Sequence, residues 1–220
     1  MLLRLYNRYV LPWVLHLACS APAIGRQRER VVPFAVGRVL EIGIGTGLNL
    51  PFYRPDAVEL VYGLEPAPEM LKRVAAKAGT VPFPIERLLC GGEAIPLSDG
   101  CIDSVVVTYT LCSVESPLQV LREIRRVLAP DGKLLFCEHG LGPTAGIRRW
   151  QRRLNWLWSM ICGGCRLDRD IKALLREAGF TTEPLEEAYL PGVPSIVGYT
   201  YWGTAYRSDT TPLPIGESFS

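Results

Sequence analysis

The chain lacks several features that would assign it to a class at once. Its 220 residues carry a net charge of only +2, so composition does not argue for a nucleic-acid partner. Seven cysteines are too few for a disulfide scaffold, which favours reduced thiols and a cytoplasmic protein. No apolar run reaches about 18 residues, so no segment is predicted to span a membrane. The first residues also lack the charged start, apolar run and cleavage site of a secretory signal.

Histidines and paired metal ligands are also scarce. The only histidines are His16 and His139, and the only C-x-x-C pair is Cys162 with Cys165. Zinc sites built from such pairs need a second pair, and redox C-x-x-C pairs open a helix in a thioredoxin-like setting, which is absent. The sequence therefore predicts no metal site. The two glycines between the cysteines are expected to form a tight turn.

The stretch VLEIGIGTGLNL, residues 39–50, organises the rest of the chain. Its apolar start predicts a buried strand, and an immediate glycine turn fits the first crossover of a parallel α/β sheet. Glycines let the backbone approach a ligand where a Cβ atom would clash. A second apolar strand, residues 61–64, ends at Glu65, a carboxylate that can accept hydrogen bonds from ribose hydroxyls.

The glycine spacing separates two nucleotide cofactors. A dinucleotide fingerprint reads G-x-G-x-x-G, but Leu48 occupies the third glycine position here, and Gly47 comes one place early. The observed G-x-G-x-G spacing resembles that of S-adenosylmethionine (SAM)-dependent methyltransferases, whose cofactor has no phosphate to hold. A turn without ligand is the alternative, and Glu65 at its expected place weighs against it.

Strands and helices are predicted to alternate along the chain. Further strands are expected at residues 85–89, 103–108, 133–137, 185–190 and 195–205. Helices are expected at residues 68–78, 117–128 and 170–178, with a first helix ending near residues 49–53.

The two ends of the chain and one insertion depart from this alternation. Residues 1–17 predict an amphipathic helix interrupted by Pro12, which packs on the domain, covers the active site or lies in a membrane interface. Residues 26–30 predict a solvated helix face. Residues 140–168 predict an inserted lid with a basic stripe and an apolar side, which closes over a lipophilic substrate or rests on an anionic membrane. Residues 207–220 predict a mobile tail.

The whole order resembles the class I SAM-dependent methyltransferases. The motifs DSVVVTYTLCSV (103–114), REIRRVLAPDGKLLFCEH (122–139) and GGCRLDRD (163–170) resemble the branch that contains the microsomal thiol methyltransferases and bacterial relatives. The ubiquinone/menaquinone methyltransferases are more distantly similar. The resemblance covers residues 31–206, preceded by a helical segment, residues 1–30. It implies a Rossmann-like α/β fold with a seven-stranded, mostly parallel sheet, helices on both faces and an antiparallel last strand.

The resemblance also implies a set of SAM contacts. The expected cofactor-binding residues are Glu41, Gly43, Gly45, Gly47, Asn49, Glu65, Pro66, Met70, Gly92, Glu93, Ala94, Thr108, Tyr109 and Leu111. The candidate catalytic residues are His139, Asp168 and Tyr109. Alternatives remain: His139 is structural, and Asp168 caps the helix that follows it.

Methyl transfer to carbon or oxygen needs a stronger base than transfer to a thiol, which is already partly ionised near neutrality. We therefore expect a SAM-dependent methyltransferase acting on a small apolar acceptor, most simply a thiol. A lipid-soluble quinone precursor or a phospholipid is the alternative acceptor. A non-catalytic, membrane-associated SAM-binding regulator is the alternative of another class, and the intact glycines and Glu65 weigh against it. Peripheral membrane contact and the oligomeric state are left open.

Overall fold

The computed structural model describes residue 6 and residues 11–209. The predictions for residues 1–5, 7–10 and 210–220, and for the side chain of His16, fall outside this described part. What the structure does give of the first segment is a helix, α2 (Leu11–Cys19), that starts one residue before Pro12. Proline is tolerated in a first helical turn, where its missing N–H is not needed.

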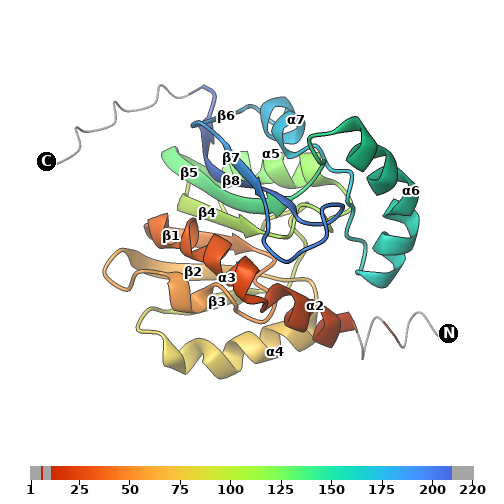
Figure 1. The fold of residues 1–220 in the computed structure, drawn as a ribbon. Coiled ribbons are helices and arrows are strands. Elements are labelled where there is room, and N and C mark those ends of the chain that lie inside the picture. The colour runs from red at the N-terminus through yellow and green to blue at the C-terminus, as the bar shows by residue number, and fades with distance from the viewer. Residues whose placement is uncertain (1–5, 7–10, 210–220) are drawn as a thin grey trace, which may run out of the picture.

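A mixed sheet forms the centre of the molecule (Figure 1). Its strands are β1 (Gly37–Ile42), β2 (Val58–Leu64), β3 (Ile85–Leu88), β4 (Ile102–Thr108), β5 (Leu128–His139), β6 (Phe180–Thr182), β7 (Glu186–Tyr189) and β8 (Tyr199–Arg207). The order is β3-β2-β1-β4-β5-β8-β6, with β7 also paired to β8. Strands β1 to β5 pair in parallel, and β8 runs antiparallel to β5. The predicted fold class is confirmed, with the three-residue β6 added to the seven expected strands.

Helices cover both faces of the sheet. They are α3 (Pro22–Glu29), α4 (Pro68–Lys77), α5 (Pro117–Val127), α6 (Ala145–Ile161) and α7 (Ile171–Glu177), with short 3-10 turns at Val32–Phe34, Leu50–Phe52 and Ala78–Thr80. One core joins α5 and α7 to the sheet, and the other joins α4 to its opposite face. The inserted helix α6 stands to one side of the sheet (Figure 1) and buries only Gln151. None of the described helices is long and apolar enough to cross a membrane.

Two sequence-based predictions near the start of the chain are wrong. No α-helix follows the glycine turn; the chain makes only a 3-10 turn, Leu50–Phe52. The three glycines all adopt positive φ, which breaks a helix, and Pro51 then opens the short turn. Residues 26–30 do not form a wholly solvated face either, because Gln27 and Arg28 are buried.

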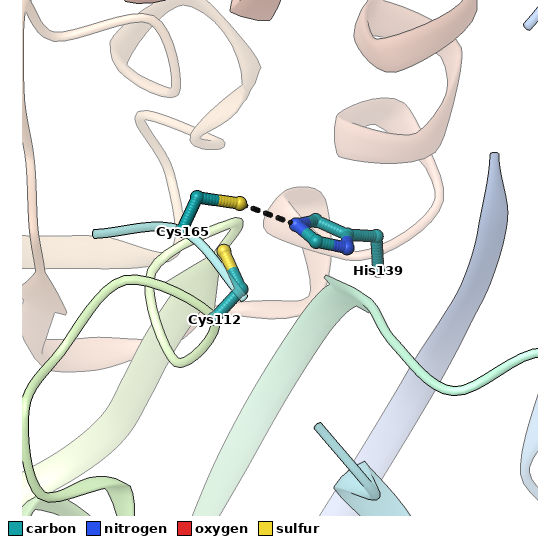
Figure 2. A group of neighbouring side chains, drawn as sticks. All are labelled: Cys112, His139 and Cys165. Atoms are coloured by element: carbon teal, nitrogen blue, oxygen red, sulfur yellow. Dashed lines mark hydrogen bonds between the residues drawn. The ribbon is translucent and has the colours of Figure 1, made fainter. Parts of the chain in front are cut away.

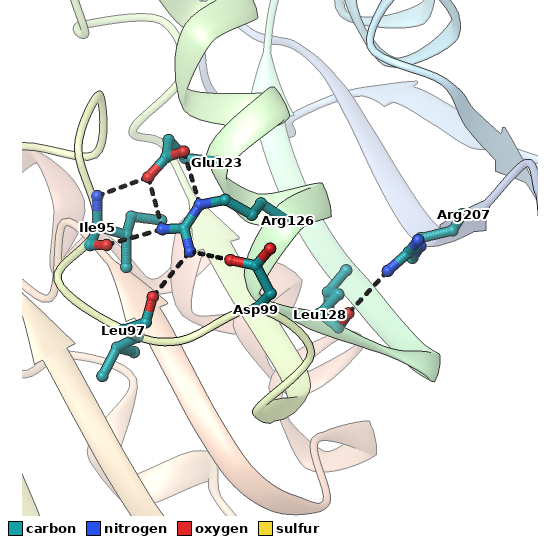
Figure 3. A network of polar contacts seen from close by, with 7 residues as sticks. All are labelled: Ile95, Leu97, Asp99, Glu123, Arg126, Leu128 and Arg207. Carbon is teal, nitrogen blue, oxygen red and sulfur yellow. Dashed lines mark hydrogen bonds and ion pairs between the residues drawn. The ribbon is translucent and has the colours of Figure 1, made fainter.

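Arg126 holds the loop between β3 and β4 against α5 (Figure 3). Its guanidinium donates to the carbonyls of Ile95 and Leu97, each at 2.8 Å, and pairs with Glu123 at 2.8 Å. It also pairs with Asp99 at 2.7 Å. Glu123 in turn accepts from the Ile95 N–H at 2.9 Å. This network fixes the loop that begins with the predicted adenine contacts.

Candidate cofactor and acceptor site

A cavity of about 460 Å³ opens at the carboxyl ends of β1, β2 and β4. This volume lies within the range of small-molecule sites. Its position is where open α/β sheets bind ligands. Most of the predicted cofactor residues lie in its wall: Glu41, Gly43, Gly45, Asn49, Glu65, Pro66, Met70, Gly92, Glu93, Thr108 and Tyr109.

The glycine turn forms one side of the cavity. A Cβ atom on Gly43 would lie 2.6 Å from the hydroxyl oxygen of Thr110, so only glycine fits. Gly45 faces open space, with its nearest protein atom at 3.8 Å, and a side chain there would enter the cavity. Gly47 lies outside the wall: its Cβ would meet Leu50 at 2.8 Å, so this glycine serves the turn itself.

Glu65 follows β2 and faces the same cavity. Its two carboxylate oxygens accept from the backbone N–H groups of Gly45, at 3.1 Å, and Ala67, at 3.0 Å. Burial raises the pKa of this carboxyl, and the two hydrogen bonds oppose that shift. The glycine turn and the carboxylate are therefore joined in one unit before any ligand enters.

Glu41 and Asn49 form a buried polar pair at the base of the cavity. The Glu41 carboxylate accepts from Asn49 at 3.0 Å and from the Tyr53 hydroxyl at 2.7 Å. Burial raises the pKa of Glu41 to about 7, against these hydrogen bonds. The Asn49 amide also donates to the Thr108 hydroxyl at 3.0 Å. Its carbonyl oxygen Oδ1 is buried and has no partner, which leaves one acceptor free in the cavity wall.

Arg28, in α3, supplies a cation that the sequence analysis missed. Its side chain is 5% exposed, lines the cavity and lies 5.8 Å over the ring of Tyr109. Its Nη1 is buried without a partner. A basic run with alternating charge is usually solvated, so the sequence did not indicate the burial of Gln27 and Arg28.

These two unpartnered atoms match the amino-acid end of SAM. A free donor on Arg28 suits a carboxylate, and a free acceptor on Asn49, beside Glu41, suits an ammonium. Glu65, also in the wall, suits a ribose diol. The residues present therefore fit this cofactor.

Tyr109 lines the cavity in a strained conformation. Its φ of 54° lies in the left-handed region, which costs a non-glycine residue about 1–3 kcal/mol. Its hydroxyl accepts from the Cys137 thiol at 3.5 Å, and burial raises its pKa above the usual value. The phenol therefore stays protonated at neutral pH.

Several predicted residues lie elsewhere. Leu111 is fully buried in the hydrophobic core, and Ala94 is exposed outside the cavity wall. His139 does not face the cavity as its place at the end of β5 suggested; it is buried with its ring against Cys165. Asp168 also lies outside the wall and pairs with Arg166 at 3.2 Å.

Asp168 is not the residue that caps the helix after it. Asp170 caps α7 by accepting from the Ala173 N–H at 3.0 Å. This leaves Asp168 with neither a capping contact nor a place in the cavity wall.

Comparisons with known proteins agree with this site. A methyltransferase-domain family matches residues 40–136, which include the glycine turn, Glu65 and the end of β4. The human thiol S-methyltransferase TMT1B is 38% identical over 175 residues, covering 74% of this chain and 71% of that protein. The ubiquinone/menaquinone biosynthesis C-methyltransferase UbiE of Geotalea uraniireducens is 32% identical over 107 residues, covering 46% of this chain and 45% of that protein.

A solved structure supports the fold. The SAM-dependent methyltransferase from Thermotoga maritima, described as a possible histamine N-methyltransferase, superposes with a TM-score of 0.63. The match covers 95% of this chain and 100% of that one at 18% identity, a level that bears on the fold alone. Together with the cavity and the curated relatives, these findings mean that the chain belongs to the SAM-dependent methyltransferases, in the family that includes the thiol S-methyltransferases, and uses S-adenosyl-L-methionine as methyl donor.

Proposed function

We propose that this enzyme transfers the methyl group of SAM to the sulfur of a small, apolar thiol. The observation that carries the proposal is the 38% identity to a thiol S-methyltransferase over three quarters of the chain. The titratable groups of the cavity wall are consistent with it. A thiol brings its own thiolate, a few per cent at neutral pH, so the protein need not supply a strong base.

The buried acid–base groups of the described wall are engaged in hydrogen bonds or hold their protons. Glu41 titrates near neutrality, but both of its oxygens already accept hydrogen bonds. Tyr109 holds its proton, and His139 lies outside the wall. These features favour an acceptor that ionises by itself over a phenol or a carbon acid.

The chain's own residues then bind and orient the reactants. Arg28 and Asn49 hold the amino-acid end of the cofactor, and Glu65 holds its ribose. Gly92 and Glu93 support the adenine from the loop that Arg126 fixes. When bound, SAM supplies an activated methyl group on a sulfonium leaving group. Alignment of the acceptor and exclusion of water are then the main tasks left to the protein.

An acceptor panel tests this proposal. Purified protein and labelled SAM are combined with thiols, phenols, a quinol and phospholipid vesicles under one set of conditions. We expect methylation of apolar thiols to be the fastest reaction. Faster methylation of the quinol or the phospholipid would contradict the thiol as acceptor and favour one of these alternative acceptors. The SAM-dependent methyltransferase activity would still stand.

We also propose peripheral contact with a membrane through helices α2 and α6, whose ends are in contact. These ends are neighbours: Tyr6 donates to the Ile161 carbonyl at 2.7 Å, and Gly163 abuts Leu11. The two helices carry exposed apolar side chains along their length: Trp13, Leu17, Trp150, Trp156, Leu157, Met160 and Ile161. Arg148, Arg149, Arg152 and Arg153 are exposed on α6. Exposed aromatic residues beside arginines suit an anionic lipid interface.

Liposome co-sedimentation tests this contact. The protein should pellet with anionic vesicles at low salt, and salt should weaken binding because surface charges are screened. Replacing Trp150 and Trp156, 52% and 68% exposed, by Ala should reduce pelleting without loss of SAM binding. Equal recovery in the supernatant with and without vesicles would contradict the proposal and favour a helix that serves only as a lid.

A further inference from the structure

Three soft ligand groups meet in the interior beside the cavity (Figure 2). The Sγ atoms of Cys112 and Cys165 and a ring nitrogen of His139 all lie within 4.8 Å of one another, and all three residues are buried. They come from the loop after β4, the turn after α6 and the end of β5. Ser113, next to Cys112, and Gly163, two residues before Cys165, line the cavity, so part of the group adjoins its wall.

Cys112 Sγ donates to the Tyr109 carbonyl at 3.6 Å and contacts the Ser113 hydroxyl at 3.4 Å, but the rest of the group is not fully partnered. The His139 Nε2 lies 2.9 Å from the Cys165 Sγ, and the other ring nitrogen is buried with no partner. The Trp158 indole N–H also points at Cys165, at 3.3 Å. A donor directed at a sulfur favours its thiolate form, which is the form that binds metals.

Two thiolates and one imidazole are a ligand set that zinc prefers. Two thiolates with a divalent cation have no net charge, so burial costs far less than it would for the bare anions. Around a tetrahedral zinc, with bonds of about 2.0 Å to nitrogen and 2.3 Å to sulfur, the N–S separation is about 3.5 Å. Binding zinc would therefore require the distance between His139 Nε2 and Cys165 Sγ to increase from 2.9 Å to about this value, a shift smaller than one bond length.

The loop that carries Cys112 is held rigidly. The buried Glu138 carboxylate accepts from three successive backbone N–H groups, those of Thr110, Leu111 and Cys112. The Arg166 N–H donates to the Cys112 carbonyl at 2.8 Å, which ties the segment after α6 to the same loop. Ligands from distant segments are thus set in place by backbone contacts, as a metal site requires.

We propose that Cys112, His139 and Cys165 bind one zinc ion through two thiolates and an imidazole, leaving the fourth position open. Only Cys165 of the C-x-x-C pair takes part. Cys162 and Cys19 lie close enough to Cys165 to affect one another electrostatically but fall outside the ligand group. Linear spacing could not reveal such a site, because its ligands come from separate segments of the chain.

Metal content tests the proposal directly. The purified, reduced full-length chain is incubated with zinc chloride, dialysed and assayed by mass spectrometry of the metal. We expect about one zinc per chain. Cys165→Ser and His139→Gln should lower this content severalfold, whereas Cys162→Ser, a matched cysteine change in the same turn, should leave it unchanged. Binding of SAM to each variant shows whether it is folded.

A second readout uses the unaltered protein. Zinc should slow alkylation of Cys112 and Cys165 but not of the partly exposed Cys90 and Cys101, as mapped by peptide mass spectrometry. Zinc content far below one per chain, or no protection of Cys112 and Cys165, would overturn the proposal. So would equal losses in the Cys162 and Cys165 variants, or recovery of a Cys112–Cys165 disulfide from the zinc-treated sample. Neither measurement needs cofactor or acceptor, so its failure leaves the proposed methyl transfer untouched.

Discussion

The two sides of the cavity are built differently. One side comes from a continuous stretch: β1, its glycine turn and Glu65, joined through the Gly45 N–H. The other side is assembled from α3, the loop after β4 and the turn after α6, which bring Arg28, Tyr109 and Gly163 together. The first side depends on backbone conformation, whereas the second depends on packing between distant segments. Changes to Glu65 on the first side should therefore weaken ribose binding. Changes to Arg28 on the second should weaken binding of the amino-acid end, which Asn49 of the first side also contacts.

Replacing Glu65 by Ala should give the largest effect. The variant loses its charge-assisted hydrogen bonds to the ribose, about 1.5–3 kcal/mol, and the contact that holds Gly45. SAM affinity, measured by calorimetry, should fall about 10- to 150-fold. Methylthioadenosine, which keeps the ribose but lacks the amino-acid part, should lose affinity to a similar degree. Glu69→Ala, an exposed change in the next helix, is the control and should bind normally.

Replacing Arg28 by Met should weaken binding of the amino-acid end of SAM without weakening binding of its ribose and adenine. The change removes the free donor in the wall while keeping most of the side-chain volume, so SAM should bind about tenfold more weakly. Methylthioadenosine should bind almost as well as before, because it has no carboxylate. Arg30→Met, an exposed change two residues away, is the matched control. Equal losses for both ligands would mean that Arg28 supports the fold and not the amino-acid end.

Replacing Gly45 by Ala should give the smallest of these losses. Gly45 and Gly100 both have positive φ, 56° and 63°, and neither has a protein atom close enough to block a Cβ. Ala at either position costs about 1–2 kcal/mol of backbone strain. Only the Gly45 variant places its methyl group in the cavity, at a further cost of about 1 kcal/mol, so SAM should bind about fivefold more weakly. Similar affinities in the two variants would contradict the placement of the cofactor against this turn.

The same contrast explains which features could be predicted from the sequence. The strands, the glycine turn and Glu65 follow one another along the chain, and their spacing is the signal. The burial of Arg28 could not be predicted, because its charged neighbours Arg26, Glu29 and Arg30 are exposed and the run looks solvated. The place of His139 was missed for a related reason: the strand end was correct, but the ring turns toward Cys165, a residue 26 positions later.

The measurement that tests the central claim most directly is the pH dependence of the methylation rate for matched acceptors. Initial rates are measured from about pH 6 to about pH 9 for an aryl-alkyl thiol, a second thiol of lower pKa and a phenol of the same shape. If the enzyme aligns a thiolate, each thiol's rate should rise to a plateau above that thiol's own pKa, so the two midpoints should differ, and both thiols should outpace the phenol. A phenol methylated faster than either thiol, with one midpoint shared by all acceptors, would point to a base on the enzyme and contradict sulfur methylation.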